Sequence, residues 1–145
     1  MEIWIENRLK RTRISQKKIR EKAEMLLHFL KMPRTQLSIV LTNDEDIANL
    51  NQRYRRKKKA TNVLSFPMYE NEKFPSKGLI LLGDVVLSEE TIQREAKALS
   101  ISFEERFWEL FIHGVLHLIG YTHTSDAEEN KMNQKTKLLL KQILH

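Results

Sequence analysis

Cysteine is absent from the 145 residues of the chain. Its absence excludes disulfide bonds, thiolate metal ligands and a cysteine nucleophile together. Any transition-metal site must therefore be built from histidine, aspartate and glutamate. Glycine and proline are also scarce, at four and three residues, and no stretch has the composition of a linker or a repeat. We therefore expect one domain over residues 1–145, a length that buries a sizeable core without cross-links.

Long apolar runs are missing as well. None approaches the roughly 20 residues that span a bilayer, and residues 1–5 (MEIWI) lack the basic and apolar regions of a signal peptide. We expect a cytoplasmic protein without a membrane partner. The net charge of +6 fits an anionic partner such as nucleic acid, although an evenly spread excess would serve only solubility.

The periodicity of the apolar residues predicts an α+β fold. Alternation of apolar and polar residues, or a short apolar run ended by turn residues, indicates four strands. These strands are expected near residues 2–7, 37–41, 62–66 and 79–87, the last one interrupted by Gly83 and Asp84.

Five helices are expected where a capping residue precedes apolar residues at helical spacing. Thr42 and Glu45 have the spacing of a capping box, in which each side chain satisfies a backbone donor of the other residue. The chain should thus form a single domain with a small mixed sheet of about four strands and about five helices. The helices are expected to begin after Ser15, Thr42, Ser88, Ser102 and Ser125.

Three of the five histidines fall within eleven residues, at positions 113, 117 and 123. His113 and His117 are four residues apart in the fourth expected helix, so they lie about 40° apart around its axis and about 6 Å along it. Gly120 offers the left-handed conformation that ends a helix, and the turn that follows can bring His123 to the same point. Three neutral imidazoles suit Zn²⁺ and leave one position open, as in a catalytic zinc site. We predict one zinc ion per chain, held by a helix and the turn that ends it.

The neighbours of these histidines distinguish the site from other metal sites. A metallopeptidase of the HExxH type has a glutamate directly after the first histidine, whereas this chain has Gly114. Gly114 fits the close approach of a strand or of a substrate backbone, or plain helix packing. Glu109, one turn before His113, either accepts a hydrogen bond from its ring or is a solvated surface residue. We interpret His28 as a helix-surface residue and His145 as a chain-end residue.

Residues 53–59 (RYRRKKK) contain six cations in seven residues. Such a run is ordinarily a solvated helix end, where cations favour the negative end of the helix dipole. It can also follow phosphates, with Tyr54 stacking on a base. We assign at least one arginine to phosphate binding, because a planar guanidinium matches the oxygens on which charge develops during phosphodiester cleavage. The candidate substrate-binding residues are Arg55, Arg56, Lys57, Lys58 and Lys59.

Residues 113–123 (HGVLHLIGYTH) resemble the signature of the YbeY family of bacterial metal-dependent endoribonucleases. Further segments match the motifs of this family in the same order, and the histidine motif is the most specific of them. The resemblance extends over roughly residues 37–132. The further matching segments are residues 54–55 (YR), 61–67 (TNVLSFP) and 83–88 (GDVVLS).

The resemblance implies that His113, His117 and His123 bind zinc and that Arg55 is the catalytic arginine. Arg55 and His113 are therefore our candidate catalytic residues. The resemblance also implies an α+β fold with the site in a cleft beside the sheet and a cytoplasmic location. The implied activity is single-strand-specific cleavage of RNA in maturation of the 16S rRNA 3′ end and in ribosome quality control. The implied partners are rRNA and the small ribosomal subunit.

The chain departs from the family at two places. Thr122 stands where an aspartate usually precedes the third histidine, and this change could weaken the outer shell of the metal. Lys58, Lys59 and Ala60 replace a common Asp-Lys-Pro, which makes the edge of the cleft more basic. Neither change removes a metal ligand.

We therefore expect zinc-assisted hydrolysis of RNA, in which Arg55 stabilises the charged transition state. No general base is evident in the sequence, so we expect metal-bound hydroxide to fill that role. The nucleophile is either water or the 2′-hydroxyl. Two alternatives remain: an rRNA-binding ribosome assembly factor with a mainly structural zinc, and a metallohydrolase of small molecules or peptides. The open ligand position counts against the first alternative, and Gly114 together with the basic run counts against the second.

Overall fold

The computed structural model describes residues 1–69 and 74–144. Its sheet has four strands in the order β1-β2-β4-β3, namely β1 (Glu2–Asn7), β2 (Thr35–Thr42), β3 (Val63–Pro67) and β4 (Ile80–Ser88). Strands β1, β2 and β4 run parallel, whereas β3 pairs with β4 in the antiparallel sense at one edge. The mixed sheet that the apolar periodicity predicts is therefore present. Residues 70–73, in the loop expected between β3 and β4, lie outside the described residues.

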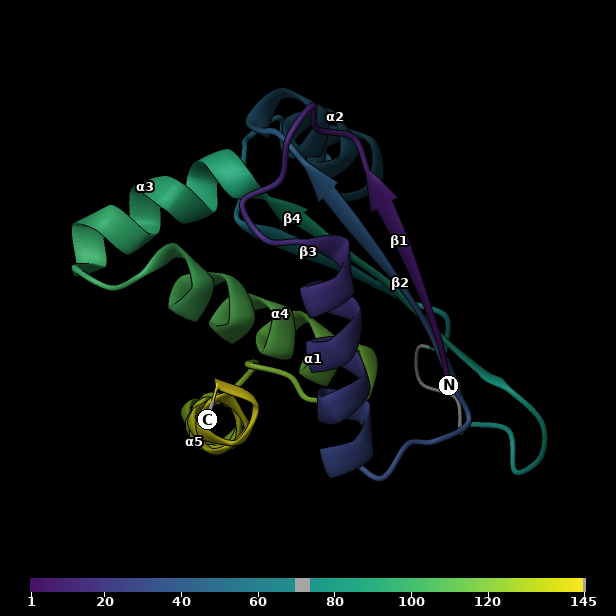
Figure 1. Cartoon of the computed structure of the whole chain (residues 1–145). Helices are drawn as coiled ribbons and strands as arrows, with labels where there is room; N and C mark the ends of the chain where they lie inside the picture. Colours follow the sequence, from purple (N-terminus) through teal and green to yellow (C-terminus); the bar gives the residue numbers. More distant parts are fainter. Residues whose placement is uncertain (70–73, 145) are drawn as a thin grey trace.

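Five helices accompany the strands, in agreement with the prediction (Figure 1). Of the helices that the structure describes, none is long and apolar enough to cross a membrane. The helices are α1 (Gln16–Phe29), α2 (Asp44–Arg55), α3 (Glu89–Leu99), α4 (Phe103–Leu118) and α5 (Asp126–Leu144).

Three of the expected capping serines hold helix starts. Each side-chain oxygen accepts a hydrogen bond of 3.0–3.2 Å from a backbone N–H three residues further on, in Ser15, Ser102 and Ser125. At α2 the predicted cap is wrong, because Asn43 rather than Thr42 accepts from the Asp46 N–H, at 2.9 Å. The Thr42 hydroxyl instead donates to the Asp46 carboxylate at 2.7 Å.

Helices cover both faces of the sheet (Figure 1). α1 and α4 pack on one face, and together with α5 and the inward side chains of the parallel strands they form the main core. On the opposite face α2 contributes Ile47 to a smaller core with Leu64 and Val86. α4 therefore lies between the sheet and α5, with its side chains enclosed over most of its surface.

The start of α2 is anchored to β4 and α3 through Asp44. Its carboxylate accepts hydrogen bonds from the hydroxyls of Ser88 and Thr91, at 2.7 and 2.5 Å, and from the Arg94 guanidinium at 2.7 Å. Burial alone would raise the pKa of Asp44, but these hydrogen bonds hold it below its usual value. Ser88 stands where the cap of α3 is expected but makes no side-chain capping bond, because its hydroxyl serves Asp44. The position of α2, which carries Arg55 at its end, is thereby fixed.

The interruption of β4 at Gly83 is an irregularity of the strand rather than its end. The pairing of β4 with β2 skips one residue there, since Gln36 pairs with Leu81 and Leu37 with Gly83. Gly83 has a φ of +135°, and a Cβ atom at this position would lie 2.2 Å from the carbonyl oxygen of Phe66. Glycine is therefore required for β3 to lie so close to β4.

Replacing Gly83 by alanine should destabilise the protein, because the added methyl group meets backbone and the positive φ strains any L residue. We expect the free energy of unfolding, measured by urea denaturation, to fall by more than the roughly 1–3 kcal/mol that a strained φ alone costs. Gly78→Ala is the matched control, since Gly78 also has a positive φ (+77°) but nothing lies within 4 Å of the added atom. Equal losses of stability in the two variants would show that the close approach of β3 contributes nothing.

Candidate metal centre and cleft

One side of α4 is a polar stripe on an otherwise buried helix. Nine residues of α4 are buried. The residues at positions 106, 109, 113 and 117 share one side of a helix with 3.6 residues per turn. Arg106, Glu109, His113 and His117 all line the same cleft. The amphipathic pattern of α4 therefore presents two of the three histidines to this cleft.

His123 joins the other two histidines through the turn that ends α4. The helix ends at Leu118, and Gly120 takes the positive φ (108°) expected of it. The candidate ligand atoms of the three histidines lie within 4.8 Å of one another. The carbonyl oxygen of Tyr121 lies 3.0 Å from His117 Nδ1. A protonated Nδ1 donates to this oxygen, which orients the ring and leaves Nε2 available as a ligand.

The environment favours the neutral form of the His113 and His117 imidazoles. Burial, followed by the charges of His117, His123 and Arg106, lowers the pKa of His113 to about 4. Burial also lowers the pKa of His117, and the charges of His123 and Arg55 act in the same direction. Neutral imidazoles keep the lone pairs that a metal requires. The donor set therefore fits Zn²⁺ with one open position.

A cleft of about 970 Å³ surrounds the histidines. Its volume lies at the upper end of the range of roughly 300–1,000 Å³ typical of small-molecule sites, so the cleft has room for more than one phosphate group. The cleft is lined by α4, by the turn that follows it, by Asn62 and by residues of three other elements. These are Tyr54 and Arg55 of α2, Val63, Ser65, Phe66 and Pro67 of β3, and Asn133, Thr136 and Lys137 of α5.

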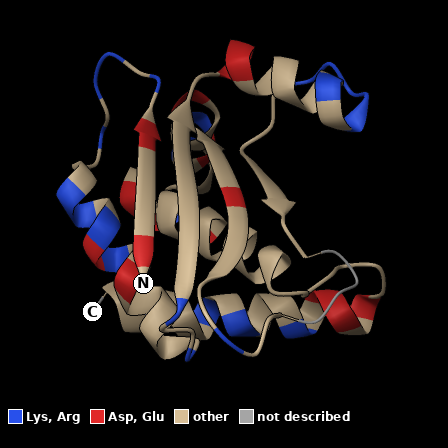
Figure 2. Ribbon diagram, turned by 90° about the vertical axis from the view of Figure 1, so that its right-hand side faces the viewer, with Lys and Arg blue, Asp and Glu red and all other residues tan. Residues whose placement is uncertain are grey.

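The end of α2 brings Arg55 to the cleft that holds the three histidines. Arg55 lines the cleft, and its charge is close enough to lower the pKa of His117. After Arg55 the chain makes a left-handed turn at Arg56, whose φ is 59°. Arg56, Lys57, Lys58 and Lys59 are exposed and are absent from the described residues that line the cleft. Figure 2 shows the basic residues gathered at this end of α2, opposite its acidic first turn.

Gly114 lies where α4 approaches the sheet most closely. A Cβ atom at this position would lie 3.0 Å from Cγ1 of Val85 and 3.3 Å from Cγ2 of Val63. Of the interpretations that the sequence leaves open, the close approach of a strand is therefore the one that the structure supports. The small residue between His113 and His117 lets β3 and β4 pack against the helix that carries these two candidate ligands.

The departure at Thr122 is accompanied by a carboxylate from another element. The hydroxyls of Thr122 and Thr124 both donate to the carboxylate of Glu128, which lies in the first turn of α5. These hydrogen bonds lower the pKa of Glu128, so it remains ionised. An acidic group thus still reaches position 122, next to His123 in the chain.

Arg106, Asn133 and Lys137 line the cleft but are not identified by sequence reasoning. Arg106 lies two turns before His113 on the same stripe, so helical periodicity alone could indicate it. Asn133 and Lys137 are one turn apart in α5, but no local signal shows that α5 packs beside the histidines. His28, interpreted as a surface residue, is exposed on α1, whereas His145 lies outside the described residues.

Fold and site together define a class of protein: a single-domain α+β protein with three histidines, able to hold a metal, in a cleft beside the sheet. Within that class, the chain belongs to the endoribonuclease YbeY family, whose model matches residues 4–144. The family that residues 113–123 resemble is therefore confirmed.

Individual relatives agree with this assignment. The chain is 43% identical to the endoribonuclease YbeY of Aquifex aeolicus (strain VF5) over 124 residues, which cover 86% of this chain and 80% of the relative. It is 39% identical to that of Geobacter metallireducens over 139 residues, or 94% of this chain and 92% of the relative. The solution structure of TM1509 from Thermotoga maritima is similar with a TM-score of 0.69 at 26% identity, covering 97% of this chain and 88% of the other.

Protein purified without added metal should carry close to one zinc per chain, as measured by mass spectrometry of the metal content. His117→Ala should sharply reduce this content, because two imidazoles bind zinc far less well than three. His28→Ala is the control and should keep the wild-type content, since His28 lies on the surface of α1. Full zinc occupancy in His117→Ala would contradict the three-histidine site.

Proposed function

We propose that this chain is a zinc-dependent, single-strand-specific endoribonuclease that acts in the cytoplasm, on the 3′ end of 16S rRNA and in ribosome quality control. The observation that carries the proposal is the meeting of Arg55 with His113, His117 and His123 in one cleft. Membership of a family whose relatives are named endoribonuclease YbeY supports RNA as the substrate. The partner that we propose is the small ribosomal subunit.

In the proposed mechanism, different side chains of the cleft have different roles in phosphodiester cleavage. Zinc, when bound by the three histidines, supplies a Lewis acid for the phosphoryl group. Arg55 provides a planar guanidinium for the oxygens on which negative charge develops. Because α2 is anchored at Asp44, this guanidinium is held beside the histidines rather than on a loose segment. Lys137 and Asn133 of α5 provide further contacts to the phosphate backbone of the RNA.

Tyr54 supports the preference for single strands. Tyr54 is 59% exposed and lines the cleft. The ring of Phe66 braces it edge-on, at 5.3 Å between centroids. An aromatic ring in this position stacks on a base whose face is free, and bases within a duplex have no free face. The scissile segment is therefore expected to be unpaired.

The direct test is incubation of the purified protein with single-stranded RNA, single-stranded DNA and a panel of peptides, each with zinc and with a chelator. We expect cleavage of the RNA alone, and only when zinc is present. Cleavage of peptides, or undiminished RNA cleavage in the chelator, would contradict the proposal. RNA binding without cleavage would favour a ribosome assembly factor with a structural zinc. The exposed cations outside the cleft are compatible with that function too, because they can bind RNA without taking part in cleavage.

Arg55→Lys separates these two functions, because lysine keeps the charge and loses the two-pronged geometry. If Arg55 binds the phosphoryl group only as charge builds in the transition state, RNA affinity should survive while the cleavage rate falls. The expected fall is about 10²–10³-fold, as for other single charge-stabilising donors, measured by single-turnover cleavage.

Arg53→Lys is the internal control for this experiment. Arg53 lies two residues earlier on α2, over the ring of Tyr54, and is absent from the described residues that line the cleft. The Arg53→Lys substitution should therefore change neither RNA affinity nor the cleavage rate appreciably. Equal, small effects at Arg53 and Arg55 would show that Arg55 is one phosphate-binding cation among several.

Replacing Lys57, Lys58 and Lys59 together by glutamine should weaken RNA binding and flatten its salt dependence, because fewer phosphates are neutralised and fewer counterions are released. For single strands the slope of log K against log salt should fall by about 0.7 for each phosphate that the variant leaves unneutralised, measured by fluorescence anisotropy. Turnover at saturating RNA should change little, because the three lysines lie outside the described lining of the cleft.

The matched control replaces three exposed lysines on other parts of the surface, Lys31, Lys97 and Lys141. This variant has the same formal charge as the first but should keep the wild-type salt slope. If both triple variants bind RNA as the wild type does, residues 57–59 are a solvated helix end.

A further inference from the structure

Among the described residues that line the cleft, Glu109 is the one acidic side chain. It lies one helical turn before His113 on the polar stripe of α4, about 6 Å along the axis. Its side chain is 36% exposed and pairs with Arg106. Within the described part of the chain no hydrogen bond joins Glu109 to the ring of His113. The ion pair with Arg106 also makes Glu109 more than a solvated surface residue, so neither interpretation offered by the sequence applies.

We propose that Glu109 is the proton acceptor for the oxygen that attacks the phosphodiester. This inference rests on the proposed function, and it supplies the general base that the sequence does not reveal. A positioned carboxylate removes a proton from an attacking oxygen as the new bond forms.

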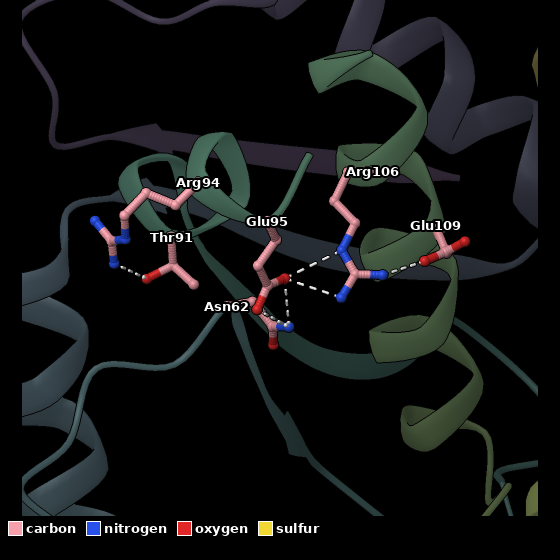
Figure 3. A network of polar contacts seen from close by, with 6 residues as sticks. All are labelled: Asn62, Thr91, Arg94, Glu95, Arg106 and Glu109. Carbon is pink, nitrogen blue, oxygen red and sulfur yellow. Dashed lines mark hydrogen bonds and ion pairs between the residues drawn. The ribbon is translucent and has the colours of Figure 1, made fainter. Parts of the chain in front are cut away.

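The carboxylate of Glu109 is held by a network that reaches three elements. The Arg106 guanidinium donates to Glu109 Oε1 on one side and to Glu95 Oε1 on the other, through Nε at 3.1 Å and Nη2 at 2.9 Å. Glu95 of α3 also accepts from the side-chain amide of Asn62, just before β3, at 3.0 Å. Figure 3 shows the guanidinium lying between the two carboxylates. Glu109 is thus fixed in the cleft instead of moving freely on the helix surface.

The same network leaves Glu109 able to accept a proton. One guanidinium serves two carboxylates, so the group of Glu95, Arg106 and Glu109 keeps a formal net charge of −1. The hydrogen bonds among the described residues occupy Oε1 of Glu109 and leave its Oε2 without a partner. That oxygen has the lone pairs to receive a proton.

No other side chain in the described cleft lining fits this role. The three histidines are committed as metal ligands, and Arg55, Arg106 and Lys137 are cations without an acceptor atom. The remaining hydroxyl groups of serine, threonine and tyrosine are poor bases near neutral pH. Among the described side chains that line the cleft, Glu109 is therefore the acceptor that we propose, in place of the metal-bound hydroxide expected from the sequence.

The proposed step balances as follows in atoms and protons. The attacking oxygen, of water or of the 2′-hydroxyl, forms a bond to phosphorus while its proton passes to Glu109. The bond from phosphorus to the leaving oxygen breaks, and the leaving oxygen takes a proton from solvent. Glu109 then releases its proton to solvent, which restores the carboxylate without an additional reactant.

The test compares Glu109→Gln with Glu95→Gln in zinc-loaded full-length protein acting on a single-stranded RNA oligonucleotide. Both variants remove one carboxylate partner of Arg106, but Glu95 is absent from the described lining of the cleft. Glu109→Gln should lower kcat by about 10²–10⁴-fold, the usual contribution of a general base, with KM and zinc content unchanged. Glu95→Gln should lower kcat only a few-fold. Added formate should restore part of the activity of Glu109→Ala and none of that of His117→Ala.

Equal reductions of kcat in the two glutamine variants would overturn the proposal and leave Glu109 a structural ion-pair partner. An increase in KM with kcat unchanged would overturn it too, because Glu109 would then bind substrate. Loss of zinc from Glu109→Gln would assign the residue to the metal centre instead. If the wild-type protein itself does not cleave RNA, the proposed function fails first, and this inference fails with it.

Discussion

The packing of α4 on the sheet at Gly114 sets the position of the α4 side of the cleft relative to its β3 wall. Any side chain there would press on Val85 and Val63, so the helix lies closer to β3 and β4 than a larger residue would allow. His113 directly precedes this contact and His117 follows within a turn, which fixes both rings relative to the β3 wall. The nine buried residues of α4 hold the helix while its polar stripe remains at the cleft. Much of the core and two of the three candidate metal ligands therefore depend on one helix.

Features determined by neighbouring residues could be predicted from the sequence. Alternating apolar residues located the strands, and single side chains such as Ser15 and Ser102 marked helix starts. The spacing of His113 and His117, with the left-handed Gly120 after them, predicted that the third histidine would meet the first two. In each case the cause is local: backbone periodicity, one capping oxygen or one permissive residue. The family resemblance identified the similarity to endoribonucleases, which no spacing alone could supply.

Features that depend on distant segments could not be predicted in this way. Thr42 and Asn43 both have capping side chains, and the choice between them follows from the burial of Thr42 at the end of β2. Ser88 likewise has the sequence of a cap, but its hydroxyl is taken by Asp44, 44 residues earlier in the chain. Lys137 enters the cleft only because α5 packs against α4. Tertiary packing decides which of two neighbouring side chains caps a helix and which hydrogen-bond partner a hydroxyl takes. The residues next to these side chains in the sequence do not determine that outcome.

In the cleft, the carboxylate proposed as the base and the cations proposed to bind phosphate are not paired with each other, so they do not neutralise each other's charge. The phosphoryl oxygens gain negative charge and require cations, whereas the attacking oxygen must lose a proton to a base. A base paired directly with the cation that binds phosphate would neutralise it. Here Glu109 pairs with Arg106, while Arg55 and Lys137 take part in none of the ion pairs among the described residues. Arg106 thus gives the carboxylate a partner of its own, and in the proposed mechanism Arg55 and Lys137 remain available for the phosphates of RNA.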